Sequence, residues 1–303
     1  MSGGASRLPN FVLAGPPKTG STSLYGYLQQ HPQVYMSGNK EPTFFGAADL
    51  WSEPYHDYTM RRIANGAPLV REWGDYVALF QDGGEETAIG EASVDYFWLP
   101  GAAQAMHAKL PAARLIFVLR DPAERLFSEY LPTLWRAQSG SPISFRAQFV
   151  AAVDRFDPAA AVRPHVGRYA THLERFFALF PRNQVRVYMY EDYRADPAGL
   201  LRDIFAFLDV DPGCPIDLSV SHNVPILPRL PRLHAMRRRL FGKTPLTTWL
   251  PEKVRRPLSR WYHQRRSNVR MSPTDRAMVI DFYREEIMRT AELLERDLSA
   301  WLR

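Results

Sequence analysis

The sequence predicts an α/β fold in which helices flank a parallel sheet, with a basic helical appendage near the C-terminus. Short apolar runs typical of buried strands alternate with segments whose apolar residues recur at helical spacing. Such alternation requires right-handed crossovers, which place helices on both faces of a parallel sheet. In addition, a glycine-containing loop at residues 15–23 follows the first strand and opens the first helix.

Each element is predicted from its own local pattern. The apolar run at 10–14 meets a Gly-Pro-Pro break, after which apolar residues recur at helical spacing. The same reasoning along the chain predicts strands at 10–14, 87–90, 114–119 and 184–190, and helices at 19–30, 102–110, 122–135, 165–180 and 197–208.

The chain is predicted to be a single domain over residues 1–303. Its parts are a core, a basic insertion and a C-terminal helix, at 10–210, 225–270 and 272–302. The insertion differs from the core because it is rich in Lys and Arg and is broken by prolines. The final helix has a capping signal: Ser272 is the expected N-cap, Pro273 takes the first helical position, and Asp275 follows three residues after the serine.

Composition excludes several classes of protein. With 46% hydrophobic and 23% charged residues, the 303-residue chain has enough apolar content for a packed core and is not disordered. The single cysteine, Cys214, excludes an internal disulfide. Because we find neither a leader sequence nor a membrane-spanning stretch, we expect a cytoplasmic protein. The net charge of +6 suggests an anionic ligand or surface without identifying it.

The loop at 15–23, Gly-Pro-Pro-Lys-Thr-Gly-Ser-Thr-Ser, predicts an anion site. Backbone N–H groups at a helix start attract anions, and the loop adds charge and hydroxyl donors. The residues expected to bind are Lys18, Thr19, Gly20, Ser21, Thr22 and Ser23. A nucleotide-kinase P-loop places its lysine after the second glycine, whereas Lys18 precedes Gly20, so the loop is only P-loop-like. A plain glycine turn with a solvated lysine is the alternative.

A second candidate lies where the strand 114–119 ends. Arg120 follows that strand directly, and Ser128 lies two helical turns further on, so both could reach one phosphate group. Taken alone, Arg120 and Asp121 could equally form a structural ion pair, and Arg125 could be a solvated helix residue.

Together these two motifs resemble those of sulfotransferases that use 3′-phosphoadenylyl sulfate (PAPS). The resemblance implies that Lys18 binds the 5′-phosphosulfate and that Arg120 and Ser128 bind the 3′-phosphate. The segment 39–45, Asn-Lys-Glu-Pro-Thr-Phe-Phe, is similar to the Glu-x-x-Phe-Phe segment of the heparan sulfate branch, which implies that Glu41 is the catalytic base. Lys40 beside it either orients that base or faces solvent.

Two later segments extend the resemblance. Residues 90–97, Gly-Glu-Ala-Ser-Val-Asp-Tyr-Phe, look like the Glu-Lys-Ser/Thr-Pro-x-Tyr-Phe segment of the same branch. Residues 167–176 closely resemble a helix of the N-sulfotransferase whose histidine lies in the active site. This implies an active-site role for His172 and cofactor binding by Tyr169. The chain departs from the family where a glycine- and lysine-rich loop would close over PAPS, because residues 221–229 read Ser-His-Asn-Val-Pro-Ile-Leu-Pro-Arg.

The resulting hypothesis is a bacterial-type PAPS-dependent sulfotransferase that acts by in-line displacement. Glu41 would take the acceptor proton, Lys18 would neutralise charge on the leaving 3′,5′-ADP, and His172 would donate to a sulfonyl oxygen or assist the base. We expect no metal, since cationic side chains take that part, and a hydroxyl or amine of a sugar, lipid or other small molecule as acceptor. The oligomeric state is left open.

Two other functions remain open at this point. One is a P-loop kinase acting on a nucleotide or small molecule, which would need Mg²⁺ and the lysine order that the loop lacks. The other is a non-catalytic binder of an anionic surface through residues 229–270, which could also bring the enzyme to a membrane. Nucleic acid is not expected as a partner.

Overall fold

The computed structural model describes residues 7–67, 69–136, 143–219 and 269–303. These residues form a five-stranded parallel sheet in the order β2-β3-β1-β4-β5. Its strands are β1 (Phe11–Leu13), β2 (Val34–Met36), β3 (Ala88–Ala92), β4 (Arg114–Leu119) and β5 (Val185–Met189). Because the strands are parallel, their carboxyl ends meet at one edge of the sheet, where ligands bind in open α/β folds.

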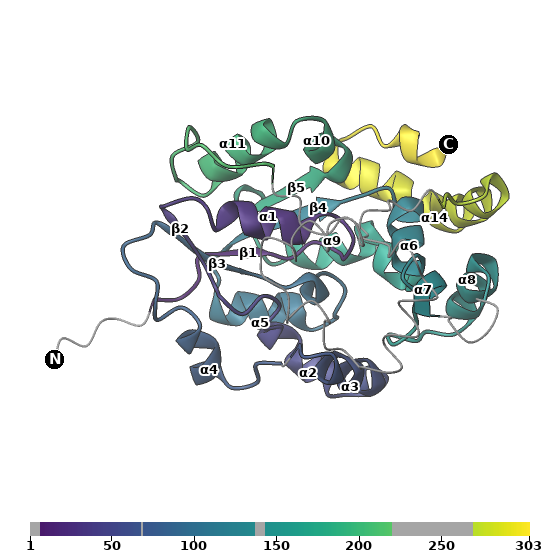
Figure 1. Ribbon diagram of the computed structural model, residues 1–303, viewed down its shortest axis with the longest axis horizontal. Coiled ribbons are helices and arrows are strands. Elements are labelled where there is room, and N and C mark those ends of the chain that lie inside the picture. Colours follow the sequence, from purple (N-terminus) through teal and green to yellow (C-terminus); the bar gives the residue numbers. More distant parts are fainter. Residues whose placement is uncertain (1–6, 68, 137–142, 220–268) are drawn as a thin grey trace, which may run out of the picture.

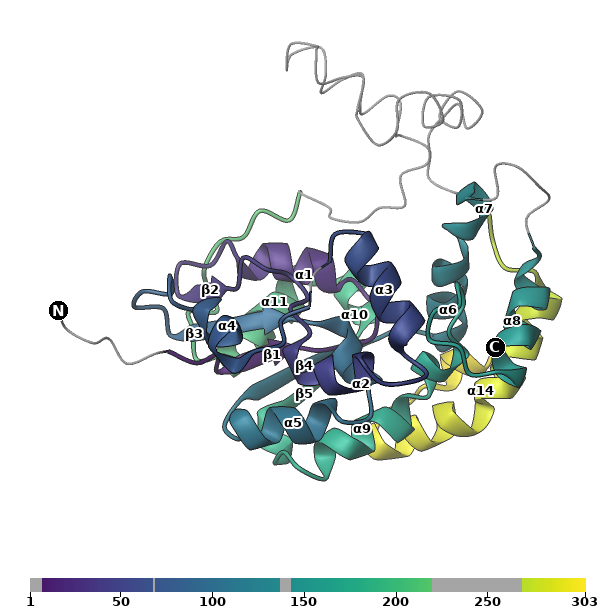
Figure 2. The ribbon, with the colours of Figure 1, turned by 90° about the horizontal axis from the view of Figure 1, so that it is seen from below.

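Helices cover both faces of the sheet (Figures 1 and 2). One face carries α1 (Ser21–Leu28), α10 (Tyr190–Ala195) and α11 (Pro197–Phe207). The opposite face is covered by α5 (Ala102–Lys109) and α9 (Tyr169–Phe177), and α14 (Pro273–Leu294) packs along α9 and α6 (Pro122–Tyr130). The remaining helices are α2 (Ala47–Leu50), α3 (His56–Ala64), α4 (Trp73–Ala78), α7 (Thr133–Arg136) and α8 (Phe145–Asp154). Short 3₁₀ turns lie at Phe44–Gly46, Val94–Phe97, Pro164–Gly167, Arg182–Gln184 and Ser299–Leu302.

The strands bury both of their faces, which explains their continuous apolar character. In β1, Phe11 and Leu13 pack with α1 and α11, whereas Val12 between them joins the core on the opposite face. In β4, Ile116 packs in the same core as Phe11 and Leu13, and Leu115 packs in the same core as Val12. All five residues are below 1% exposed, as expected for strands covered by helices on both sides.

The predicted fold class is confirmed. The sequence analysis did not predict β2, α2, α3, α4, α8 and α10, and some predicted elements end at other residues. The expected helix at 122–135 is two helices, since Pro132 has no N–H to continue the first. The expected helix at 165–180 begins as a 3₁₀ turn before α9. The capping signal at Ser272 is confirmed, because its Oγ accepts the Asp275 N–H at 3.1 Å. That helix, however, ends at Leu294, where Glu295 adopts a left-handed conformation, and residues 299–302 form a separate turn.

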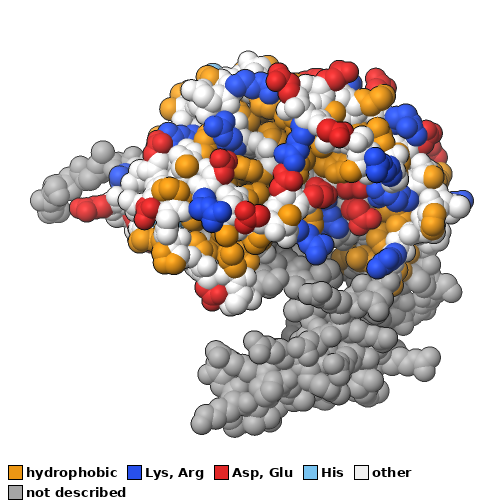
Figure 3. Space-filling model, turned by 90° about the horizontal axis from the view of Figure 1, so that it is seen from above, with side chains coloured by type: hydrophobic (Ala, Val, Ile, Leu, Met, Phe, Trp, Pro, Cys, Tyr) orange, Lys and Arg blue, Asp and Glu red, His pale blue; other side chains and the backbone are white. Residues whose placement is uncertain are grey.

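Some predictions fall on residues outside the described part of the chain. They include the altered loop at 221–229 and almost all of the basic insertion at 225–270. On the face shown in Figure 3, acidic and basic side chains are intermixed over the described surface. No helix of the described residues is long and apolar enough to cross a membrane. The single-domain organisation and the cytoplasmic location stay predictions.

Candidate active site

The loop after β1 packs tightly against the neighbouring strand. A Cβ atom on Gly15 would lie 2.7 Å from the backbone nitrogen of Val118, so only glycine fits there. Lys18 and Gly20 have positive φ angles of 71° and 92°, and Gly20 is the N-cap of α1. Buried Thr19 donates its hydroxyl to the Pro16 carbonyl at 2.7 Å. The loop thus has a fixed shape that leads directly into a helix N-terminus, where anions bind.

The other predicted loop residues follow in the first turn of α1. Ser21 and Ser23 are buried, and Thr22 is half-buried. Lys18 is exposed at the tip of the loop. This arrangement gives the loop a cation on its outer side and hydroxyl groups at the helix start.

Arg120 joins the end of β4 to this loop. Its Nη1 donates to the Lys18 carbonyl at 3.2 Å, and its guanidinium lies 4.8 Å from the ring centre of Tyr190. The backbone carbonyl of Arg120 accepts the Tyr169 hydroxyl at 2.8 Å. The two motifs recognised in the sequence are therefore in direct contact, and Tyr169 lies against them.

The structure gives the charged residues of this segment other partners than those expected. Asp121 does not pair with Arg120; it caps α6 and forms an ion pair with Arg276 of α14 at 2.6 Å, whereas Arg120 lies 3.5 Å from the Glu124 carboxylate. Arg125 is not solvated, because its side chain is fully buried and pairs with Glu129 at 3.2 Å. Ser128 is half-buried on the same helix.

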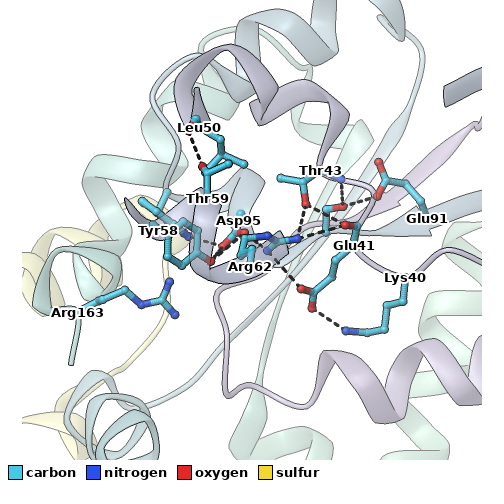
Figure 4. A network of polar contacts seen from close by, with 12 residues as sticks. Lys40, Glu41, Thr43, Leu50, Tyr58, Thr59, Arg62, Glu91, Asp95 and Arg163 are labelled. Atoms are coloured by element: carbon cyan, nitrogen blue, oxygen red, sulfur yellow. Dashed lines mark hydrogen bonds and ion pairs between the residues drawn. The ribbon is translucent and has the colours of Figure 1, made fainter. Parts of the chain in front are cut away.

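Glu41 lies at the end of β3, on the other side of β1 from Arg120. Its backbone N–H donates to the Ala92 carbonyl at 2.9 Å, and its φ angle is 66°. The carboxylate is one-quarter exposed and receives the Lys40 ammonium at 2.8 Å (Figure 4). Lys40 thus contacts the predicted base, as expected if it orients that base.

Two charged residues that the sequence did not single out support Glu41. Arg62 of α3 lies with Nη1 3.6 Å from the Glu41 carboxylate, and it also forms an ion pair with buried Asp95. Asp95 accepts further hydrogen bonds from the Tyr58 hydroxyl at 2.8 Å and the Trp98 indole at 3.0 Å. Figure 4 shows Arg62 between the carboxylates of Glu41 and Asp95.

A second carboxyl group, Glu91, is fully buried on β3 behind Glu41. It accepts hydrogen bonds from Ser93 at 2.6 Å, Tyr96 at 2.7 Å and Tyr76 at 3.0 Å. Burial raises the pKa of Glu91 to about 7, although these hydrogen bonds favour the ionised form and oppose the rise. Ser93 also accepts the Thr43 N–H at 3.2 Å, which links Glu91 to the segment that carries Glu41.

His172 is buried in α9 with partners at both ring nitrogens. Nε2 lies 2.8 Å from the His165 carbonyl, to which it can only donate, so Nδ1 is the acceptor for Arg175. Burial, followed by the nearby Arg175 charge, lowers the pKa of His172 to about 3. The ring is therefore neutral at physiological pH. To contact a sulfonyl oxygen, its Nε2–H would have to leave the His165 carbonyl.

The site therefore draws on three strand ends. Lys18 follows β1, Glu41 lies beside the end of β3, and Arg120 follows β4, all at the carboxyl edge of the sheet. Within the described residues, no group of His, Cys, Asp and Glu is arranged to hold a metal ion. The loop with Lys18 and the segment with Arg120 can together bind an anionic donor. The Glu41 carboxylate at the same edge can accept a proton.

Comparison with known proteins identifies this arrangement. A model of the sulfotransferase family matches residues 9–212, which is about two-thirds of the chain. The chain belongs to the sulfotransferase family. Membership of this family favours sulfuryl transfer over the kinase and the non-catalytic binder that the sequence left open.

Its relatives include eukaryotic and bacterial sulfotransferases. Human carbohydrate sulfotransferase 15 is 26% identical over 97% of this chain, and the match covers 54% of that protein. A human bifunctional heparan sulfate N-deacetylase/N-sulfotransferase, number 3, is 27% identical over 68% of this chain and 23% of its own length. The chain thus spans about half the length, or less, of these curated relatives. The crystal structure of a sulfotransferase from Alicyclobacillus acidocaldarius is 29% identical, with a TM-score of 0.73 over 98% of this chain and 100% of that one.

Proposed function

We propose that this sulfotransferase transfers the sulfuryl group of PAPS to a hydroxyl or amine of a carbohydrate. The observation that carries the proposal is the contact between Arg120 and the Lys18 carbonyl, since it joins the two segments that resemble the PAPS motifs. The names of the curated relatives support a carbohydrate acceptor. The sequence analysis also allowed a lipid or another small molecule as the acceptor.

On the nucleotide side, each segment has a separate task. The α1 N-terminus and the hydroxyls of Thr22 and its neighbours would bind the 5′-phosphosulfate, with Lys18 beside the bridging oxygen. Arg120 and Ser128 would bind the 3′-phosphate, and Tyr169 would fix the Arg120 backbone through its hydroxyl. Binding of both phosphates distinguishes PAPS from nucleotides that have no 3′-phosphate.

On the acceptor side, Glu41 would act as the base. As the acceptor oxygen or nitrogen forms its bond to sulfur, the bond from sulfur to the bridging oxygen breaks and 3′,5′-ADP leaves. The acceptor proton passes to the Glu41 carboxylate, and Lys18 neutralises the negative charge that grows on the leaving oxygen. The side chain of Glu41 is one-quarter exposed, which leaves it accessible to an acceptor.

The proposal is tested by radiolabel transfer. Purified full-length enzyme is incubated with ³⁵S-labelled PAPS and with desulfated heparan sulfate, glucosamine oligosaccharides or a simple phenol. We expect label in a carbohydrate, and calorimetry is expected to show tighter binding of 3′,5′-ADP than of 5′-ADP or of ATP with Mg²⁺. Label in the phenol alone would overturn the acceptor class. Equal binding of all three nucleotides would overturn the use of PAPS.

A further inference from the structure

Arg62 has contacts that its place in the sequence does not suggest. It lies in the last turn of α3, a helix whose neighbouring residues Arg61 and Ile63 are exposed, yet the Arg62 side chain is only 9% exposed. Burying a guanidinium is costly unless each of its groups has a partner. The partners therefore indicate what the residue does.

Its two terminal nitrogens contact three parts of the site. Nη1 pairs with Asp95 and lies 3.6 Å from the Glu41 carboxylate. Nη2 donates to the backbone carbonyl of Glu41 at 3.3 Å and to the Thr43 hydroxyl at 3.1 Å. That hydroxyl in turn donates to the same Glu41 carbonyl at 3.0 Å.

The segment that Arg62 holds is under backbone strain. Glu41 and Thr43 adopt positive φ angles of 66° and 55°, which L-residues other than glycine seldom occupy. Such conformations persist where surrounding contacts impose them. Arg62 contacts both strained residues, so it is placed to impose the conformation in which the Glu41 carboxylate lies between Arg62 and Lys40 (Figure 4).

We propose that Arg62 is a positioning residue for Glu41. Asp95 anchors the guanidinium, and the guanidinium then fixes both the backbone and the carboxylate of Glu41 relative to the acceptor. Nε of Arg62 is buried without a hydrogen-bond partner among the described residues, a cost that the contacts of the two terminal nitrogens have to offset. The inference rests on the proposed function, since it takes Glu41 to be the base.

The geometry also requires arginine at this position. The planar guanidinium reaches Asp95, Thr43 and the Glu41 backbone together, whereas a lysine ammonium is a single point of charge on a flexible chain. Arg62→Lys keeps the charge opposite Asp95 but loses the two-nitrogen bridge. We therefore expect it to recover only part of the activity that Arg62→Met loses.

The experiment measures transfer from ³⁵S-labelled PAPS to desulfated heparan sulfate, together with calorimetric binding of 3′,5′-ADP. Arg62→Met is expected to lower kcat by about 10²-fold, the effect of a misplaced catalytic group, with the Kd of 3′,5′-ADP unchanged. Arg61→Met is the matched control, because that exposed arginine lies on the same helix and its side chain donates to the Ala159 carbonyl at 2.7 Å rather than to the Glu41 segment. Its kcat is expected to equal that of wild type.

A double variant separates positioning from general stabilisation. If Arg62 acts through Glu41, adding Arg62→Met to Glu41→Gln leaves the already low kcat unchanged, because there is no base left to position. A further loss equal to that of Arg62→Met alone would overturn the proposal. Should Arg62→Met fold poorly, Arg62→Met with Asp95→Asn removes both buried charges at once and is expected to show the same loss of kcat.

The outcomes also separate this inference from the proposed function. If the wild-type enzyme transfers label and folded Arg62→Met has the same kcat, only the positioning role is overturned. Failure of wild-type enzyme to transfer label from PAPS would overturn the proposed function, and the positioning role with it.

Discussion

The buried carboxyl of Glu91 makes the stability of this enzyme depend on pH in an unusual direction. Its pKa in the folded protein is about 7, whereas an unfolded glutamate has a pKa of about 4.3. Between these values the folded protein binds a proton that the unfolded chain releases. Stability from this group is therefore complete below about pH 4.3 and is lost as the pH rises through about 7.

The size of the effect follows from the same two values. A carboxyl group that is protonated up to about pH 7 rather than about pH 4.3 contributes about 3 to 4 kcal/mol over that interval. The Glu91→Gln variant cannot ionise, so this contribution no longer changes with pH. We expect the difference in unfolding free energy between variant and wild type to shift by that amount, in favour of the variant, from pH 4 to pH 8.

The assay is urea unfolding of both proteins at several pH values, followed by circular dichroism. Tyr76→Phe supplies an independent check, because it removes a 3.0 Å hydrogen bond that favours the ionised carboxylate. In that variant the loss of stability is expected to move to higher pH. A difference between Glu91→Gln and wild type that stays constant from pH 4 to 8 would refute the reasoning.

Three other substitutions test the proposed reaction, each measured by radiolabel transfer and by calorimetry. Lys18→Ala is expected to lower kcat by about 10²–10³-fold, the range for losing one charge-stabilising donor, and near-normal turnover in folded protein would remove Lys18 from the mechanism. Ser128→Ala leaves the contact between Arg120 and Lys18 intact and is expected to weaken 3′,5′-ADP by about 1.5–3 kcal/mol, whereas an equal loss for 5′-ADP would contradict its role at the 3′-phosphate. Glu41→Gln is expected to keep nucleotide binding and to slow transfer by about 10²–10⁴-fold; full activity there, with loss in His172→Ala, would make His172 the base.

That the two proposed nucleotide-binding segments lie together could be predicted, because the signals for them are local. A strand, a glycine loop and a helix follow one another at residues 11–28, and another strand leads directly to Arg120. Parallel pairing of β1 with β4 then brings the two loops to one edge of the sheet. The contact between Arg120 and Lys18 follows from this pairing of neighbouring strands.

The support for Glu41 could not be predicted, because it depends on contacts between distant segments. Arg62 lies 21 positions from Glu41 and 33 from Asp95, on a helix that the sequence analysis did not identify. Its charge looks like that of any solvated helix residue, as did the charge of Arg125, and only tertiary packing buries either side chain. The burial of Arg125 and the contacts of Arg62 with Glu41 and Asp95 are properties of the assembled fold.

The two halves of the site rest on separate parts of the fold. The proposed nucleotide side is held by β1, β4 and the tyrosines of α9 and α10, which contact the Arg120 backbone and guanidinium. Glu41, the proposed base, is held by β3 and by Arg62 of α3, a helix that lies outside the sheet. Changes in α3 or in the segment around Glu41 can therefore alter the acceptor side without disturbing the contact between Lys18 and Arg120. This separation would let the acceptor side vary while the proposed donor side stays the same.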